Sequence, residues 1–495
     1  MTGEVPVPSE GWPFIRSHKW AILLISLALL VPCFWHRHIE AGDLSSHVYN
    51  AWLAQLIEKG QAPGLYFVHQ WDNVLVDWML LHCANLLGFA AAEKVVASLC
   101  VLIFFWGIFA LITAASGQLP WFLAPCIAML AYGYSFNMGF LNYYLSLGLA
   151  AGSLALVWRG RGLARLLGLL IVPFILLAHP IGILWLLGSG LYLILWSKLP
   201  SWWKLAVPAA AVGAMFVVHS YLVRQTRFPV DWNHPAIYLM NGADQLTLYG
   251  PRYAALGWAA LIFGALCVLV EVISRRRETS FWKCLTLPAG LYFVSIISVA
   301  LLPENLRPSI SGGWIGLLAS RLTAIAAIFG LCLMGCLRPR KWHLAGFGAC
   351  AVLFLAFLYQ DTLTLNRMES QVEQLVSPLS SGTRVMSTIW APPGSRVSFV
   401  GHFVDRACVH HCFSYANYEP ASGQFRIRVR PGSPVVVASD DDSEDMQAGE
   451  YEVQDEDLPA MEIYQCDVKD LTKLCIRSLA AGEKNGRLGY KPSPD

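Results

Sequence analysis

Long runs of uncharged apolar residues are the feature that most constrains the fold of this chain. A helix needs about 20 mainly apolar residues to cross the ~30 Å hydrocarbon core of a bilayer. Only 14% of the 495 residues are charged, whereas soluble domains carry about 25%. We therefore predict a polytopic α-helical membrane protein with about 11 transmembrane helices, near residues 19–35, 95–115, 120–135, 140–158, 164–178, 181–197, 205–221, 254–273, 284–302, 321–337 and 342–360.

The basic residues of the short loops predict how these helices are oriented. Cytoplasmic loops carry an excess of Lys and Arg. With a cytoplasmic N-terminus, the basic clusters of the short loops fall on one side, at 159–165, 198–204, 275–283 and 338–341. The first span lacks a small-residue cleavage site after residue 35, so we interpret it as a signal anchor. The net charge of +2 gives no indication of a nucleic-acid partner.

The long loops then lie on the external side, at 36–94, 222–253 and 303–320. The apolar segment 74–92 is predicted to be an amphipathic helix at the interface. An additional transmembrane span in this segment would move every later loop to the opposite side of the membrane. We therefore place the transmembrane domain, with its external loop, at residues 1–360.

The composition changes abruptly at about residue 361, which predicts a soluble external domain over 361–495. A helix is expected at 366–376. Short runs with β character indicate a mixed or β-rich domain, and they lie at 384–389, 425–429, 434–438 and 462–468. The acidic run 440–445 is expected to be a solvated loop.

Four of the 13 cysteines lie in this polar tail, at Cys408, Cys412, Cys466 and Cys475. An even set predicts disulfides if the compartment is oxidising, and free thiols if it is reducing. The predicted topology favours disulfides. Two histidines between Cys408 and Cys412 resemble a zinc site, but neighbouring side chains point apart and no second ligand pair follows. The cysteines of the apolar runs, Cys336 among them, are interpreted as small hydrophobic residues.

The first external loop contains the most informative motif. Asp43 is a suitable N-cap for a helix over 44–59, and Gly60 is a suitable end. Asp43 and His47 face the same way because they are four residues apart. An apolar stripe on this helix is suited to the membrane surface, and it contains Trp52, Leu53, Leu56 and Ile57.

Asp43 has two interpretations. The first is a helix cap with no chemistry. The second is a catalytic carboxylate at the membrane–water boundary, which orients or deprotonates an acceptor hydroxyl or stabilises an oxocarbenium-like transition state. The two are compatible, because a helix N-terminus stabilises an anion.

The layout resembles the GT-C superfamily of integral-membrane glycosyltransferases. The resemblance rests on the position of the Gly42-Asp43 motif directly after the first span, followed by many spans and a C-terminal domain. Segments 134–144 and 178–182 are similar to those of uncharacterised bacterial membrane proteins of this plan. The resemblance implies a polyprenyl-phosphate-linked sugar donor, an inverting transfer and Asp43 as the catalytic residue. A divalent metal is left open, but Asp43 has no adjacent acidic partner to support one, so no cofactor is assigned.

Six further residues are candidates for substrate binding. Arg321 suits a lipid phosphate, because arginine binds phosphate through two N–H groups, although it is also placed to snorkel to the interface. Arg37 has the same two interpretations. His47 faces Asp43. The other three have structural alternatives as caps or solvated residues, and they are Asp72, Asp77 and His179.

We expect a membrane glycosyltransferase that acts on its external face upon a saccharide, lipid or protein acceptor. In a bacterium it would lie in the inner membrane with a periplasmic tail, and in a eukaryote the tail would be luminal. A transporter or flippase for a lipid-linked saccharide is the main alternative. It requires ionisable residues at mid-membrane, and the span interiors have few. A non-catalytic membrane assembly protein is the third interpretation.

Overall fold

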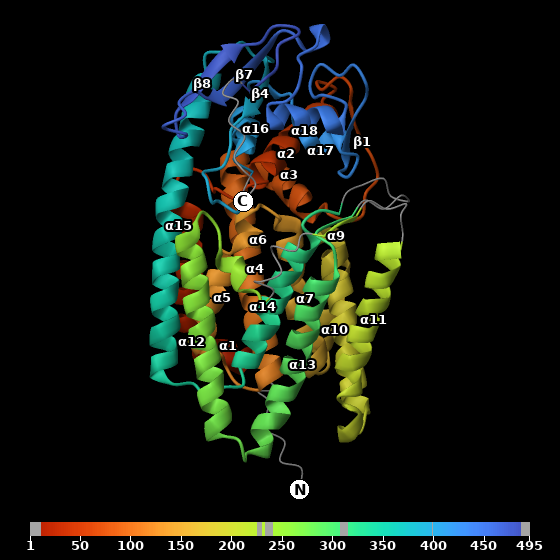
Figure 1. Ribbon diagram of the computed structural model, residues 1–495, viewed down its shortest axis with the longest axis vertical. Coiled ribbons are helices and arrows are strands. Elements are labelled where there is room, and N and C mark those ends of the chain that lie inside the picture. The colour runs from red at the N-terminus through yellow and green to blue at the C-terminus, as the bar shows by residue number, and fades with distance from the viewer. Residues whose placement is uncertain (1–10, 225–229, 233–240, 307–314, 398, 487–495) are drawn as a thin grey trace.

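Long helices form a bundle with a smaller mixed domain at one end (Figure 1). The computed structural model describes residues 11–224, 230–232, 241–306, 315–397 and 399–486. In these residues, eight helices are long and apolar enough to cross a membrane. They are α1 (Gly11–Phe34), α4 (Phe89–Ser116), α7 (Leu141–Arg159), α10 (Pro180–Lys198), α11 (Ala206–Arg224), α12 (Pro251–Ser274), α13 (Thr279–Leu301) and α15 (Lys341–Val376). The protein is an integral membrane protein of the predicted fold class.

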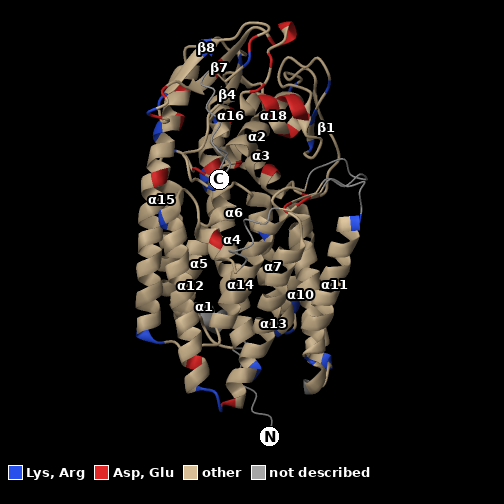
Figure 2. Ribbon diagram, viewed as in Figure 1, with Lys and Arg blue, Asp and Glu red and all other residues tan. Residues whose placement is uncertain are grey.

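The remaining apolar runs form shorter helices. They are α5 (Ala124–Ala131), the consecutive α8 (Leu163–Leu170) and α9 (Val172–Ala178), and α14 (Leu318–Met334). Every predicted span therefore contains a helix, but the count of 11 crossings stays a prediction. Charged residues gather in the tail and at the opposite end of the bundle (Figure 2). This distribution keeps most charges out of the hydrocarbon layer.

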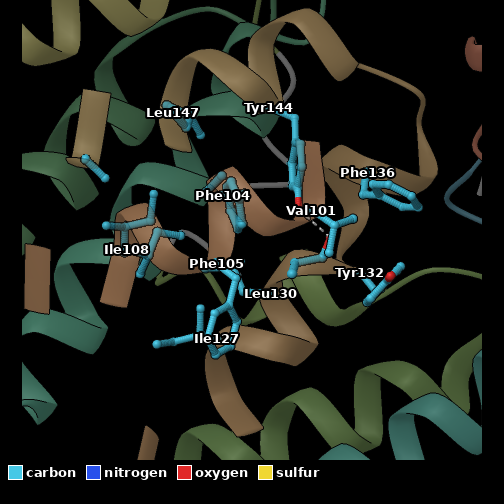
Figure 3. Packing of buried hydrophobic residues seen from close by; sticks show 14 of the residues in the cluster. Val101, Phe104, Phe105, Ile108, Ile127, Leu130, Tyr132, Phe136, Tyr144 and Leu147 are labelled. Carbon is cyan, nitrogen blue, oxygen red and sulfur yellow. Dashed lines mark hydrogen bonds between the residues drawn. The ribbon is translucent and has the colours of Figure 1, made fainter. Parts of the chain in front are cut away.

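The centre of the bundle is the tightly packed crossing of α4 and α7. Gly107 and Gly148 allow the two backbones to meet, because a Cβ atom on Gly107 would overlap the Gly148 carbonyl oxygen. Small residues favour such close contacts between membrane helices. Phe104 and Tyr144 stack beside this crossing with ring centroids 4.1 Å apart (Figure 3).

The first loop folds against the tail. It contains α2 (Leu44–Glu58), β1 (Leu65–Phe67) and α3 (Leu75–Leu87). The expectation that the apolar stripe of α2 lies on the membrane surface is wrong, because Trp52 and Leu53 are buried in one core with tail residues. The helix predicted at 74–92 is shorter than expected, since it ends before Gly88 and α4 begins at Phe89.

The tail contains a four-stranded sheet in the order β5-β4-β7-β8. These strands are β4 (Arg384–Thr388), β5 (Phe413–Ser414), β7 (Ala460–Gln465) and β8 (Leu474–Ser478). β4 runs parallel to β5 and β7, whereas β8 is antiparallel to β7. A separate strand, β6 (Ile427–Val429), pairs with β1, so the first loop and the tail share a small sheet.

Three local predictions for the tail are corrected. Residues 366–376 continue α15 rather than form a separate helix, and 434–438 form no strand. The acidic run begins α18 (Asp440–Ala448). The side chain of Ser439 caps this helix, and acidic residues in its first turn favour its N-terminus.

The prediction of disulfides among the tail cysteines is confirmed, and the structure pairs Cys408 with Cys412 and Cys466 with Cys475. Cys284 and Cys336 are also paired. The interpretation of Cys336 as a small hydrophobic residue is therefore wrong, because α13 and the end of α14 bring two thiols together that lie far apart in the sequence.

A buried ion-pair network joins the tail to the bundle. Arg406, on α16 (Phe403–Ala407), donates two hydrogen bonds to the Glu369 carboxylate, at 2.6 and 2.9 Å. Arg406 also donates to Glu93 of α4 at 2.6 Å. Glu93 in turn accepts from the Ile39 backbone nitrogen. One guanidinium thus joins the tail, α15, α4 and the first loop.

Replacing Arg406 with alanine is expected to destabilise the protein by about 3–5 kcal/mol, because two buried carboxylates lose their cation. Thermal unfolding of the purified full chain in detergent measures the effect. Arg367→Ala is the matched control, since Arg367 lies on the same helix as Glu369 but is exposed. Equal midpoints for Arg406→Ala and the wild type would show that the network does not stabilise the fold.

Candidate active site

Asp43 lies where the first loop meets the tail. It precedes α2, but its side chain does not cap the helix. The Tyr418 hydroxyl instead donates to Asp43 Oδ1 at 2.8 Å, and His402 Nε2 lies 3.7 Å from the same oxygen. Among the described residues, Oδ2 has no hydrogen-bond partner, although 10% of the side chain is exposed. The carboxylate therefore has one fixed oxygen and one available oxygen.

Two glycines fix the backbone of Asp43. Gly42 has a φ of 31° and Gly139 a φ of 79°, a region that favours glycine. A Cβ atom on Gly139 would overlap the Asp43 backbone nitrogen, and one on Gly42 would lie 2.6 Å from the Met138 oxygen. The Asp43 N–H donates to that oxygen at 3.1 Å. The loop before α7 therefore sets the position of the carboxylate.

His47 lies among buried carboxylates. Its Nδ1 is 3.0 Å from Asp77 Oδ1 and 3.5 Å from Glu419 Oε1. Burial lowers the pKa of His47, but Asp77 and then Glu419 outweigh burial and raise the pKa to about 10. His47 is therefore a cation at neutral pH, which balances the carboxylates around it.

Glu419 lies on the tail helix α17 (Tyr418–Ala421). Burial raises the pKa of Glu419 to about 8, against the opposing effect of His47. Ser46 of α2 donates to the Glu419 carboxylate at 3.0 Å. The tail thus contributes a buried acid that faces the cation of His47.

Arg321 lies in the first turn of α14. Its guanidinium lies over the Phe140 ring, 4.3 Å from the centroid, and its buried Nε has no hydrogen-bond partner among the described residues. No described residue forms an ion pair with it. Asp43 and Tyr418 are near enough to interact with it electrostatically. Because Phe140 follows Gly139, one loop positions both the carboxylate and the cation.

The other predicted residues lie apart from this cluster or have structural partners. His179 Nδ1 accepts a hydrogen bond from Ile181, so the histidine caps α10. Arg37 is 2.9 Å from Glu373 on α15. Asp72 makes no hydrogen bond or ion pair with a described residue. The structure therefore brings Asp43, His47, Asp77 and Arg321 together, and His179 also interacts electrostatically with Arg321. Nothing in the described contacts joins Arg37 or Asp72 to them.

Sequence analysis missed the tail residues of the site, which are His402, Asp405, Tyr418 and Glu419. Each lies more than 300 positions from Asp43 and has no distinctive motif. Asp405 adjoins the segment considered for zinc, where Cys408 and Cys412 now form a disulfide. Among the described residues, no group of three His, Cys, Asp or Glu side chains could hold a metal ion.

The sequence matches no family model and no curated protein. The fold is similar to the crystal structure of ArnT from Cupriavidus metallidurans bound to undecaprenyl phosphate, with a TM-score of 0.45 and 12% identity over 92% of this chain and 94% of that one. The apo ArnT structure gives a TM-score of 0.34 and 13% identity over 91% and 93%. At these scores the similarity assigns no role to any residue.

The stability of the protein is expected to fall as the pH rises from 6.5 to about 10. A histidine with a raised folded pKa stabilises the fold fully below its unfolded pKa, and this contribution is lost as the pH passes the folded pKa. Glu419 acts in the same direction between pH 4.5 and about 8. Thermal midpoints across this range measure the decline.

His47→Gln should make the decline with pH shallower. His82→Gln is the matched control, since His82 is exposed on the neighbouring α3. A decline of unchanged slope in His47→Gln would contradict the assignment of a buried cation.

Proposed function

We propose that the protein is a membrane glycosyltransferase that moves a sugar from a polyprenyl-phosphate-linked donor to an acceptor hydroxyl. One observation carries the proposal. A carboxylate with an available oxygen, Asp43, lies near a cation that pairs with no described residue, Arg321, where the bundle meets the tail. Such a transfer requires a base for the acceptor and a cation for the phosphate.

The proposed reaction is a single displacement with inversion. The acceptor oxygen forms a bond to the anomeric carbon on the face opposite the phosphate. The bond from that carbon to the phosphate oxygen breaks, and its electron pair leaves with the phosphate. Asp43 Oδ2 accepts the proton of the hydroxyl as a general base. The N-terminus of α2 favours the ionised carboxylate.

Arg321 is proposed to bind the phosphate before and after this step. A guanidinium stays charged and can donate two parallel hydrogen bonds to phosphate. The Phe140 ring limits the orientations of the Arg321 guanidinium, and Nε has no hydrogen-bond partner in the described part of the chain. A buried donor without a partner is costly, so a bound anion would remove that cost.

We further propose that the reaction occurs on the external face, with the tail in the periplasm of a bacterial inner membrane. The basic short loops support this orientation, because they lie at the end of the bundle opposite the tail (Figure 2). A saccharide, lipid or protein hydroxyl would approach Asp43 from the side of the tail.

Asp43→Asn is expected to lower transfer by about 100- to 10,000-fold, the range that loss of a general base produces. The assay follows a radiolabelled sugar from a panel of polyprenyl-phosphate donors in membranes, at matched expression. Asp441→Asn is the control, since Asp441 is exposed on α18. Transfer at the wild-type rate by Asp43→Asn would exclude Asp43 as the base.

A binding measurement tests Arg321 separately, with undecaprenyl phosphate as the probe. Arg321→Gln should weaken binding, and Arg321→Lys should restore part of it, because lysine keeps the charge without the two-pronged geometry. Arg367→Gln is the control. If the wild type transfers no sugar from any donor but moves a lipid-linked saccharide across vesicles, the flippase alternative is correct.

A further inference from the structure

One arginine of the tail lies within the bundle. The Arg396 backbone nitrogen donates to the Leu248 oxygen at 2.7 Å, and the next residue, Val397, is buried in the core of the bundle. The Arg396 guanidinium lies over the Tyr134 ring, 4.1 Å from the centroid, and its Nη1 is 2.9 Å from Asp244 Oδ2. The Asp244 side chain is only 2% exposed, so the tail supplies a cation to a buried carboxylate of the bundle.

Asp244 also holds the start of α14. It lies on the short helix η4 (Ala243–Leu246), which packs against α14. The Thr323 hydroxyl of α14 donates at 2.7 Å to Asp244 Oδ2, the oxygen that faces Arg396. Thr323 comes two residues after Arg321, the proposed phosphate ligand. One carboxylate oxygen therefore joins the tail cation to the part of α14 that carries Arg321.

The residue before Arg321 is held by the same group of side chains. Arg396 Nη2 lies 3.5 Å from the Ser320 Oγ, and the Ser320 hydroxyl donates to Glu304 at 2.6 Å. Gln245 of η4 donates to the Ser320 carbonyl oxygen at 3.0 Å. The first turn of α14 is thus fixed by side chains on both sides of Arg321.

The start of α14 needs this support because its backbone is strained. Leu317 precedes the helix with a φ of 52°, a conformation that is unfavourable for residues other than glycine. The Arg321 side chain makes no hydrogen bond or ion pair with a described residue. The position of its guanidinium therefore depends on the backbone of this turn and on the rings of Phe140 and Tyr143.

We propose that Arg396 is a positioning residue that sets Arg321 in place for the donor phosphate. This inference rests on the proposed glycosyltransferase function. Arg396 attracts the Asp244 carboxylate, which holds the start of α14 through Thr323, and that turn directs the Arg321 guanidinium. Donor binding then depends on a docked tail. The tail thereby contributes to the phosphate side of the site as well as to the surroundings of Asp43.

Binding of undecaprenyl phosphate to the purified full chain in detergent tests this inference. Arg396→Gln should raise the dissociation constant by at least about tenfold, the effect of losing one hydrogen bond to a charged group. Arg396→Lys should restore part of the affinity, because lysine keeps the charge beside Asp244. The number of binding sites per protein should stay that of the wild type. Arg367→Gln, at an exposed position of α15, is the control.

A purely structural role for Arg396 would give a different result. Misfolded protein does not bind, so such a role would lower the number of sites and leave the dissociation constant of the remaining sites unchanged. This outcome would overturn the inference.

A double-mutant cycle shows whether Arg396 acts through Arg321. If it does, Arg396→Gln should weaken binding in the wild-type background and have no further effect in an Arg321→Gln chain. An equal loss of affinity in both backgrounds would show that Arg396 acts independently of Arg321 and would overturn the inference.

Thr323→Val is the second variant, in case Arg396→Gln does not fold. It removes the hydroxyl that joins α14 to Asp244 and leaves the ion pair with Arg396 intact. It should raise the dissociation constant several-fold. Thr362→Val is the matched control, because the hydroxyl of this buried threonine donates only within α15. An unchanged dissociation constant in Thr323→Val would contradict the positioning role.

The outcomes separate this inference from the proposed function. A wild type that binds no undecaprenyl phosphate overturns the proposed donor and this inference together. A wild type that binds it, with Arg321→Gln weakened and Arg396→Gln unchanged, overturns this inference alone.

Discussion

The buried guanidinium of Arg406 is the interaction on which the arrangement of the rest depends. Apolar contacts hold the first loop against the tail, but they are not directional and specify position only loosely. The hydrogen bonds from Arg406 to Glu369 and Glu93 are directional and lie in a buried environment. A shifted tail would leave these charges buried and unpaired, which costs several kcal/mol. The network therefore defines one docked position.

The docked position of the tail matters because the segment at α16 contains both Arg406 and part of the candidate site. Arg406 and Asp405 are adjacent, and His402 precedes the same short helix. When Arg406 is in place, Asp405 contacts His402, and His402 lies 3.7 Å from Asp43. A second connection, the pairing of β1 with β6, fixes the first loop to the same domain. The geometry of the site thus follows from the docking of the tail.

The sequence predicts the bundle better than it predicts the site. A run of apolar residues needs only its own length and composition to indicate a helix in the membrane. The stripe on α2 shows the limit of this reasoning, because an apolar face does not reveal whether lipid or protein covers it. Asp43 and His47 lie at the same end of α2, and their spacing alone predicts that they face the same way. Tyr418 lies 375 positions from Asp43, and no local period encodes such a contact.

The buried charges around Asp43 are partly balanced by one another. Buried charges persist when they are paired. His47 faces Asp77, and His402 faces Asp405. Asp43 and Arg321 interact without forming an ion pair in the described structure, since Tyr418 engages the carboxylate and Phe140 lies against the guanidinium. A direct ion pair would neutralise both groups. The proposed transfer uses the carboxylate as a proton acceptor and the guanidinium as an anion-binding donor, so it depends on the two groups not pairing with each other.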